Sequence, residues 1–174
     1  MRSNPNVFLI GPMGSGKTAV GRQVARGLNL PFYDSDVEIE RRTGVDIPFI
    51  FDKEGEAGFR EREREAIATL TALQGIVLAT GGGAVLLPQN RQLLAARGRV
   101  VYLQTSVVQQ VHRVSHGRHR PLLNQGDPTE RLTQLLQARA PLYAGIADIT
   151  VSTDGRRVQV VAEQILRELA EMGP

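Results

Sequence analysis

One eight-residue motif near the start of the chain constrains its fold more than any other feature. Residues 11–18 read Gly-Pro-Met-Gly-Ser-Gly-Lys-Thr and fit the pattern G-x-x-x-x-G-K-[ST]. A short apolar run at 7–10, typical of a buried parallel strand, precedes the motif, and a segment with helical apolar spacing follows it. Glycines in such a loop let backbone N–H groups turn inward around phosphate oxygens. The motif therefore predicts a strand, a phosphate-binding loop and a helix in succession.

The motif also contains the first candidate nucleotide-binding residues. Lys17 is placed to reach the β- and γ-phosphates of ATP or GTP, and the Thr18 hydroxyl to bind Mg²⁺. The helix that starts here adds its positive N-terminal dipole. The candidate nucleotide-binding residues in this part of the chain are Gly14, Ser15, Gly16, Lys17, Thr18 and Ala19.

Strand-like and helix-like segments alternate along the rest of the chain. Four further apolar runs, at 31–34, 76–79, 100–103 and 149–151, read as short buried strands. Five such strands separated by helical segments indicate an α/β fold, a parallel sheet with helices on both faces. The last helix should carry an apolar stripe of Val158, Val161, Ile165 and Leu169. With no repeat or linker in the sequence, we expect a single domain over residues 1–174.

Composition narrows the function classes. The 174 residues include no Cys, which excludes thiolate metal sites, disulfides and cysteine nucleophiles. No apolar run is long enough to span a membrane and no signal peptide opens the chain, so we expect a cytoplasmic protein without a membrane partner. The net charge is +3, yet only Lys17 and Lys53 are lysines, and arginine suits carboxylates and phosphates. Aromatic residues are 5%, which is thin for stacking on nucleic-acid bases.

Two carboxylates follow the second predicted strand. Asp34 and Asp36 flank Ser35, at the end of a parallel strand where α/β proteins bind ligands. Carboxylates there could serve a magnesium ion and an acceptor hydroxyl. The alternative is that one of them caps the following helix.

Charged residues interrupt the apolar stripes of two predicted helices. Glu63 lies on the stripe of Phe59, with Arg60 three residues before it, and Arg139 stands within an apolar row from Leu132 to Tyr143. An inward charge is costly unless it is paired or faces a cleft. Two inward arginines on different helices suggest a bound carboxylate. The alternatives are a solvated Arg/Glu face for the first pair and a snorkelling side chain for Arg139.

Two loops complete the candidate site. Thr80 and three glycines, Gly81, Gly82 and Gly83, follow the third predicted strand, where they form either a plain turn or a close approach to a small molecule. The basic stretch 112–126 could bind nucleic acid, be an ordinary solvated loop, or form a lid over about 112–124 that brings Arg120 to a transferring phosphate.

Taken together, these motifs resemble the shikimate kinase family. The resemblance covers nearly the whole chain: the phosphate loop, Tyr-Asp-Ser-Asp at 33–36, Gly-Phe-Arg at 58–60 with Glu63, Ala-Thr-Gly-Gly-Gly at 79–83, Arg-Pro-Leu-Leu at 120–123, and Arg-Ala-Pro-Leu-Tyr at 139–143. It implies a nucleoside-monophosphate-kinase-like fold with strand order 2-3-1-4-5 and a substrate-binding excursion at about 34–62. It also implies transfer of the ATP γ-phosphate to the 3-hydroxyl of shikimate, on the route to chorismate and the aromatic amino acids.

The resemblance also implies a role for each matching residue. Thr18 and Asp34 would serve Mg²⁺; Lys17, Asp36 and Arg120 would be catalytic. Shikimate would lie against Asp36, Arg60, Glu63, Gly81, Gly82, Gly83 and Arg139. Arg113 and Arg156 would lie near the adenine, with Arg120 on the phosphates. The parts all come from one chain, which favours a monomer.

Three alternatives remain open at this point. A related small-molecule kinase, such as gluconate kinase, would share the fold and the phosphate loop. A nucleotide switch that has lost its chemistry is disfavoured by the presence of Lys17, Asp36 and Arg120. Nucleic-acid binding is supported only by the basic charge balance.

Overall fold

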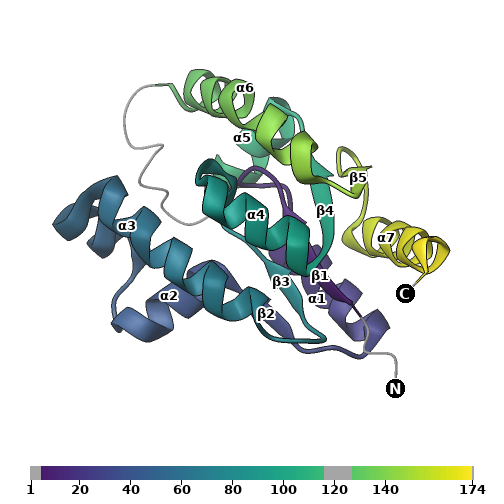
Figure 1. Cartoon of the computed structure of the whole chain (residues 1–174). Helices are drawn as coiled ribbons and strands as arrows, with labels where there is room; N and C mark the ends of the chain where they lie inside the picture. Colours follow the sequence, from purple (N-terminus) through teal and green to yellow (C-terminus); the bar gives the residue numbers. More distant parts are fainter. Residues whose placement is uncertain (1–4, 116–126, 174) are drawn as a thin grey trace.

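Five parallel strands form one sheet in a computed structural model that describes residues 5–115 and 127–173. The strand order is β2-β3-β1-β4-β5, which confirms the expected topology. The strands are β1 (Asn6–Ile10), β2 (Phe32–Asp34), β3 (Val77–Ala79), β4 (Gly98–Gln104) and β5 (Ile149–Ser152). Every neighbouring pair is parallel, and helices lie on both sides of the sheet (Figure 1).

Helices connect the strands. They are α1 (Lys17–Leu28), α2 (Ser35–Thr43), α3 (Ile47–Thr71), η1 (Ala84–Leu86), α4 (Pro88–Arg97), α5 (Val107–Ser115), α6 (Pro128–Ile146) and α7 (Val158–Met172). The predicted strand bounds were wrong at some ends. The clearest case is β4, which starts at Gly98 rather than Val100, because Gly98 and Arg99 pair with Asn6 and Val7 of β1. None of the helices in the two described segments is long and apolar enough to cross a membrane.

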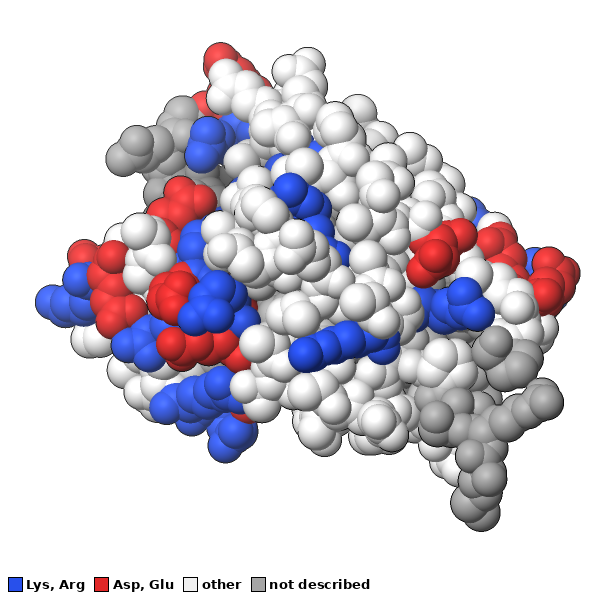
Figure 2. All heavy atoms as spheres, in the orientation of Figure 1, with Lys and Arg blue, Asp and Glu red and all other residues white. Residues whose placement is uncertain are grey.

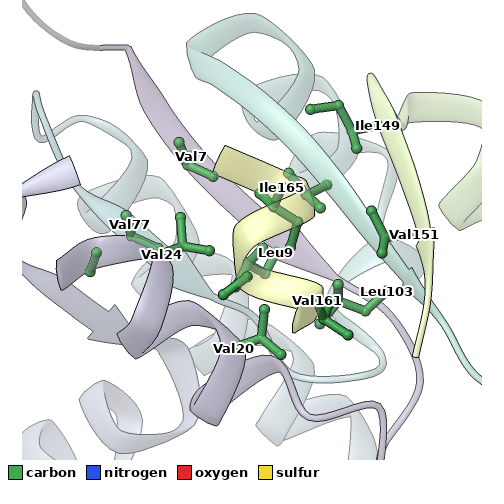
Figure 3. Packing of buried hydrophobic residues seen from close by; sticks show 13 residues of the cluster. Val7, Leu9, Val20, Val24, Val77, Leu103, Ile149, Val151, Val161 and Ile165 are labelled. Carbon is green, nitrogen blue, oxygen red and sulfur yellow. The ribbon is translucent and has the colours of Figure 1, made fainter. Parts of the chain in front are cut away.

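The central strand β1 is buried on both faces, as its continuous apolar run predicts. Val7 and Leu9 point to the side of α1 and α7, where they pack with Val20, Val24 and Ile165 (Figure 3). Phe8 and Ile10 point to the opposite side, into a second cluster that includes residues of α3, α4 and α6. The sheet is therefore covered twice, and its strand ends are held in fixed positions.

The stripe predicted for the last helix is correct except at its first residue. Val161 and Ile165 of α7 are buried, whereas Val158 remains 38% exposed. Val158 is the first residue of α7 and lies one turn before the part of the helix that reaches the core.

The segment between β2 and β3 forms a small unit of its own. Helices α2 and α3 pack around Ile39, Ile50, Phe59 and Ala66, separate from the two clusters on the sheet. The second helix is interrupted at Gly55, where φ is 72° and ψ is −177°. The excursion expected at about 34–62 is thus two helices, of which the second continues to Thr71.

Candidate active site

The loop after β1 has the geometry of an anion cradle. Gly16, at φ 88°, is the residue before α1, and no side chain caps that helix. Its first N–H groups are therefore left to a ligand, together with the positive end of the helix dipole. Gly11, at φ 150°, lies so close to β4 that a Cβ there would be 2.6 Å from the Leu103 carbonyl oxygen. The loop geometry is therefore suited to an anion, and Gly11 leaves no room for a side chain.

Lys17 lies over this cradle with its ammonium group held by the loop. Its Nζ donates to the carbonyl oxygens of Gly11 at 2.7 Å and Pro12 at 2.9 Å, and lies 3.3 Å from Ser15 Oγ. The side chain is buried, but it lines a large cavity. The Lys17 ammonium group thus lies where the cradle borders the cavity, within reach of a bound phosphate group.

Asp34 serves two purposes at the end of β2. Its Oδ1 accepts from the backbone N–H groups of Asp36 at 2.9 Å and Val37 at 3.2 Å, and so caps α2. Its Oδ2 accepts from the Thr18 hydroxyl at 2.9 Å. The capping alternative and the placement beside Thr18 are both correct. A hydroxyl and a carboxylate in contact are the hard oxygen donors that Mg²⁺ prefers, with further positions left to water and phosphates. The residues present therefore fit a magnesium ion.

The three glycines after β3 are packed by side chains rather than left open. A Cβ on Gly81 would be 2.9 Å from both Asp36 Oδ1 and Glu63 Oε2, and one on Gly83 would be 2.4 Å from the guanidinium of Arg60. Gly82 is less crowded, with Met13 N at 3.3 Å from the same position. Two of the three glycines are thus required by the approach of other site residues.

Two residues that the sequence reasoning did not assign fix this glycine loop. Ser35 is fully buried, and its Oγ accepts from the N–H of Gly81 at 3.0 Å. The Tyr143 hydroxyl donates to the carbonyl of Gly82 at 2.5 Å. Burial raises the pKa of Tyr143, so this hydroxyl keeps its proton and remains a donor. The position of Ser35 between two aspartates was a sequence signal that could have identified it. Tyr143 had no signal beyond its place in an apolar row.

Arg60 and Glu63 form a buried ion pair on α3. Arg60 Nη1 lies 2.9 Å from Glu63 Oε1, and Glu63 is 1% exposed. Burial raises the pKa of Glu63, while the neighbouring Arg60 lowers it. Arg60 Nη2 also contacts Glu56 Oε1 at 3.3 Å. The solvated-face alternative holds for Arg62 and Arg64, which pair with Glu54 and Glu61 at the surface, but not for Arg60.

Arg139 enters the same cavity from α6. It is 5% exposed and lines the cavity wall with Arg60, so the snorkelling alternative is wrong. Burial lowers the pKa of Arg139, the positive charge of Arg60 lowers it further, and the Tyr143 hydroxyl raises it. Two arginines on one cavity wall, of which Arg60 is paired with the buried Glu63, bring positive charge to this end of the cavity, where an anionic ligand could use it.

A cavity of about 1050 Å³ joins the phosphate cradle to this pair of arginines. Of the predicted residues, it is lined by Gly14, Gly16, Lys17, Thr18, Ala19, Asp34, Asp36, Arg60, Glu63, Gly81, Gly82, Gly83, Arg113 and Arg139. An apolar side of the cavity, from Ile47, Pro48 and Phe51, was not foreseen. Sequence-distant residues are thus gathered around one space that is large enough for a nucleotide phosphate chain and a small acid.

Some predicted residues lie elsewhere. Ser15 is buried beneath the cradle, and Arg156 lies in the turn after β5, where it donates to the carbonyl of Ser152 at 2.9 Å. Neither is among the described residues that line the cavity. Arg113 belongs to α5 and donates to the carbonyl of Gly14 at 2.6 Å. In the stretch 112–124 that was expected to form a lid, residues 112–115 belong to α5, and the remainder, with Arg120, lies outside the described residues.

Comparison with known proteins decides among the kinases that could use such a cavity. The family model for shikimate kinase matches residues 13–170. The chain belongs to the shikimate kinase family. A shikimate kinase of Pseudomonas syringae pv. tomato is 56% identical over 169 residues, which cover 97% of this chain and 98% of that protein. One from Vibrio cholerae is 53% identical over 171 residues, covering 98% of each.

Solved structures agree with the sequence relatives. A shikimate kinase from Acinetobacter baumannii in complex with shikimate has a TM-score of 0.95 and 46% identity, covering 98% of this chain and 95% of that one. A gluconokinase from Sinorhizobium meliloti has a TM-score of 0.62 at 18% identity, which shows a shared fold alone. The family assignment therefore favours shikimate kinase over the gluconate kinase alternative.

Proposed function

We propose that this chain transfers the γ-phosphate of ATP to the 3-hydroxyl of shikimate, a step on the route to chorismate and the aromatic amino acids. The observation that carries the proposal is the single cavity that joins the Lys17 phosphate cradle to the buried pair Arg60 and Arg139. ATP fits the first end and the carboxylate of shikimate fits the second. The complex of the Acinetobacter baumannii relative with shikimate supports the same substrate.

The acceptor would be oriented by groups from three elements. Arg60 on α3 and Arg139 on α6 would bind its carboxylate, and a planar guanidinium can do so through two parallel hydrogen bonds. Asp36 lines the cavity between this wall and the cradle, beside Gly81. Its carboxylate would accept a hydrogen bond from a ring hydroxyl and hold that oxygen toward the phosphate. In a loose transition state the proton of the acceptor leaves late, so orientation of the hydroxyl is the larger part of this role.

At the ATP end of the cavity, the main role of the protein would be to stabilise the negative charge of the phosphates. Phosphoryl transfer passes through a loose transition state, so the protein's main contribution is positioning and electrostatic stabilisation. Lys17 and Arg113 carry fixed positive charges at the cradle. Thr18 and Asp34 would hold Mg²⁺, which neutralises phosphate charge when bound. For Arg120, the sequence motif alone supports a place on the phosphates, and for Arg156 a place near the adenine.

Further features of the proposal concern the assembly, the location and the kind of acceptor. The sequence of one chain contains every motif that the proposed reaction needs, which supports a monomer as the working unit. A co-substrate such as ATP supports the expected cytoplasmic location. The buried position of the arginine pair, rather than a basic surface, supports a small-molecule acceptor and not a nucleic acid.

The direct test measures ADP release with ATP and, separately, shikimate, gluconate, AMP or no acceptor. Shikimate alone should give turnover well above the rate without an acceptor. Equal or faster turnover with gluconate would favour the related kinase. A rate that does not depend on any acceptor would favour a nucleotide switch.

Replacing Gly83 with alanine should weaken shikimate binding strongly and ATP binding little. The new Cβ would stand 2.4 Å from the Arg60 guanidinium, which cannot retreat freely because Glu63 holds it. Calorimetric titration of both ligands measures the difference. Gly145→Ala on α6 is the matched control, because a Cβ there has nothing within 4 Å. Wild-type shikimate affinity in Gly83→Ala would contradict the assignment of Arg60.

A further inference from the structure

Arg60 has two carboxylate partners of different character. Glu63 is buried, with a side chain 1% exposed, and its contact with Nη1 measures 2.9 Å. Glu56 lies one turn earlier on α3, its side chain is 50% exposed, and its contact with Nη2 measures 3.3 Å. The first partner belongs to the protein interior. The second is long, half in water and therefore replaceable.

The Glu56 carboxylate also lies within electrostatic range of Arg139. Its negative charge raises the pKa of Arg139, whereas the positive charge of Arg60 lowers it. A single carboxylate thus acts on both arginines of the cavity wall. Its contact with Nη2 occupies a donor of Arg60 that an anionic ligand would otherwise use.

Glu56 lies outside the small core that α2 and α3 share. Gly55, directly before it, interrupts α3 in a left-handed conformation, so Glu56 begins the second stretch of that helix. Figure 2 shows acidic and basic side chains mixed over the part of the molecule that α2 and α3 form in Figure 1. The buried residues of α3 begin again only at Phe59.

We propose that Glu56 holds the place of the substrate carboxylate on Arg60 in the empty site and is displaced when an anionic acceptor binds. The proposal rests on the proposed function, since it names which part of shikimate takes that place. One carboxylate would exchange for another, so the arginine wall stays neutralised in both states. An uncharged polyol could not compensate the two arginines in this way and would be rejected. Glu56 is therefore a residue that sets affinity and specificity, and it does not take part in the chemistry.

The test compares Glu56→Gln with the wild-type chain. Glutamine keeps the size and one oxygen for Arg60 but removes the competing charge. Because exposed ion pairs are weak, we expect the dissociation constant and KM for shikimate to fall about threefold to fivefold, with kcat unchanged. Binding of shikimate methyl ester, which lacks the anion, should not change. Glu54→Gln is the matched control, because Glu54 is on the same helix but pairs with Arg62 at 2.6 Å and 2.8 Å; it should leave both constants as they are.

Other outcomes separate the two hypotheses. Shikimate binding that is unchanged or weaker in Glu56→Gln, with normal wild-type turnover, would overturn the role of Glu56 and leave the proposed function standing. An equal gain in Glu54→Gln would also overturn it, because a general charge effect would then explain the result. A wild-type chain that neither binds nor phosphorylates shikimate would overturn the proposed function itself.

Discussion

Replacing Lys17 with alanine is expected to lower kcat more than tenfold and nucleotide affinity much less. The ammonium group is held over the phosphate cradle by the carbonyls of Gly11 and Pro12, 2.7 Å and 2.9 Å away. Negative charge on the phosphate oxygens shifts during transfer, so a fixed cation stabilises the transition state more than the bound substrate. Steady-state kinetics with ATP and shikimate give kcat, and a separate titration gives the affinity for ATP.

The matched control for this variant is Lys53→Ala. Lys53 is the second lysine of the chain, is exposed, and pairs with Asp52 at 3.7 Å on the surface. It should retain wild-type rates. Circular dichroism and the midpoint of thermal unfolding show whether Lys17→Ala is still folded. A folded Lys17→Ala variant that keeps more than about a tenth of the wild-type kcat would contradict the assignment of the cradle.

Removing either arginine of the cavity wall is expected to cost about 2–5 kcal/mol of shikimate binding, the range found when one partner of a desolvated charge pair is truncated. Arg60 and Arg139 are both buried and line the same cavity. Lysine should rescue binding poorly at either position, because it lacks the planar fork of donors. Calorimetric titration of shikimate with Arg60→Ala, Arg139→Ala and the two lysine variants measures these losses.

Arg60→Ala and Arg139→Ala differ in which partner groups they leave unpaired. Arg60→Ala leaves the buried Glu63 carboxylate without its cation, so this variant is also expected to have a lower folding stability. Arg139 interacts within α6 with the Tyr143 hydroxyl rather than with a carboxylate, so Arg139→Ala leaves no buried carboxylate of that helix without its cation and is the cleaner measurement. Arg62→Ala, which breaks a surface pair with Glu54, is the control and should bind shikimate normally. Normal shikimate binding in both alanine variants would mean that the two arginines are structural.

Much of this site could be predicted because its signals are local in the sequence. The phosphate loop follows from the spacing of residues 11–18, and the strands from short apolar runs. Arg60 and Arg139 could be identified because burying a charge on an apolar stripe costs free energy unless the charge is paired or faces a cleft. Both side chains do face the cavity.

The remaining contacts depend on residues that meet only in the folded chain. Ser35 and Gly81 are 46 positions apart, and Tyr143 and Gly82 are 61 apart. Apart from the two aspartates that flank Ser35, nothing near Ser35 or Tyr143 in the sequence predicts those hydrogen bonds. The same holds for Glu56, which reads as one more charge on a solvated helix until its contact with Arg60 is seen. Asp34 was ambiguous for another reason: helix capping and placement beside Thr18 use different oxygens of one carboxylate.

The separate cluster that joins α2 to α3 has a consequence for how acceptor choice can change. The phosphate cradle is built on β1 and α1, whose packing lies within the main sheet, whereas Arg60 and the apolar side of the cavity belong to a unit with its own small core. Substitutions in that unit can reshape the acceptor end without disturbing the strands that hold the donor end. The donor end and part of the acceptor end therefore rest on different hydrophobic clusters. Acceptor specificity can thus change through substitutions in α2 and α3 while the cluster behind the phosphate cradle stays the same.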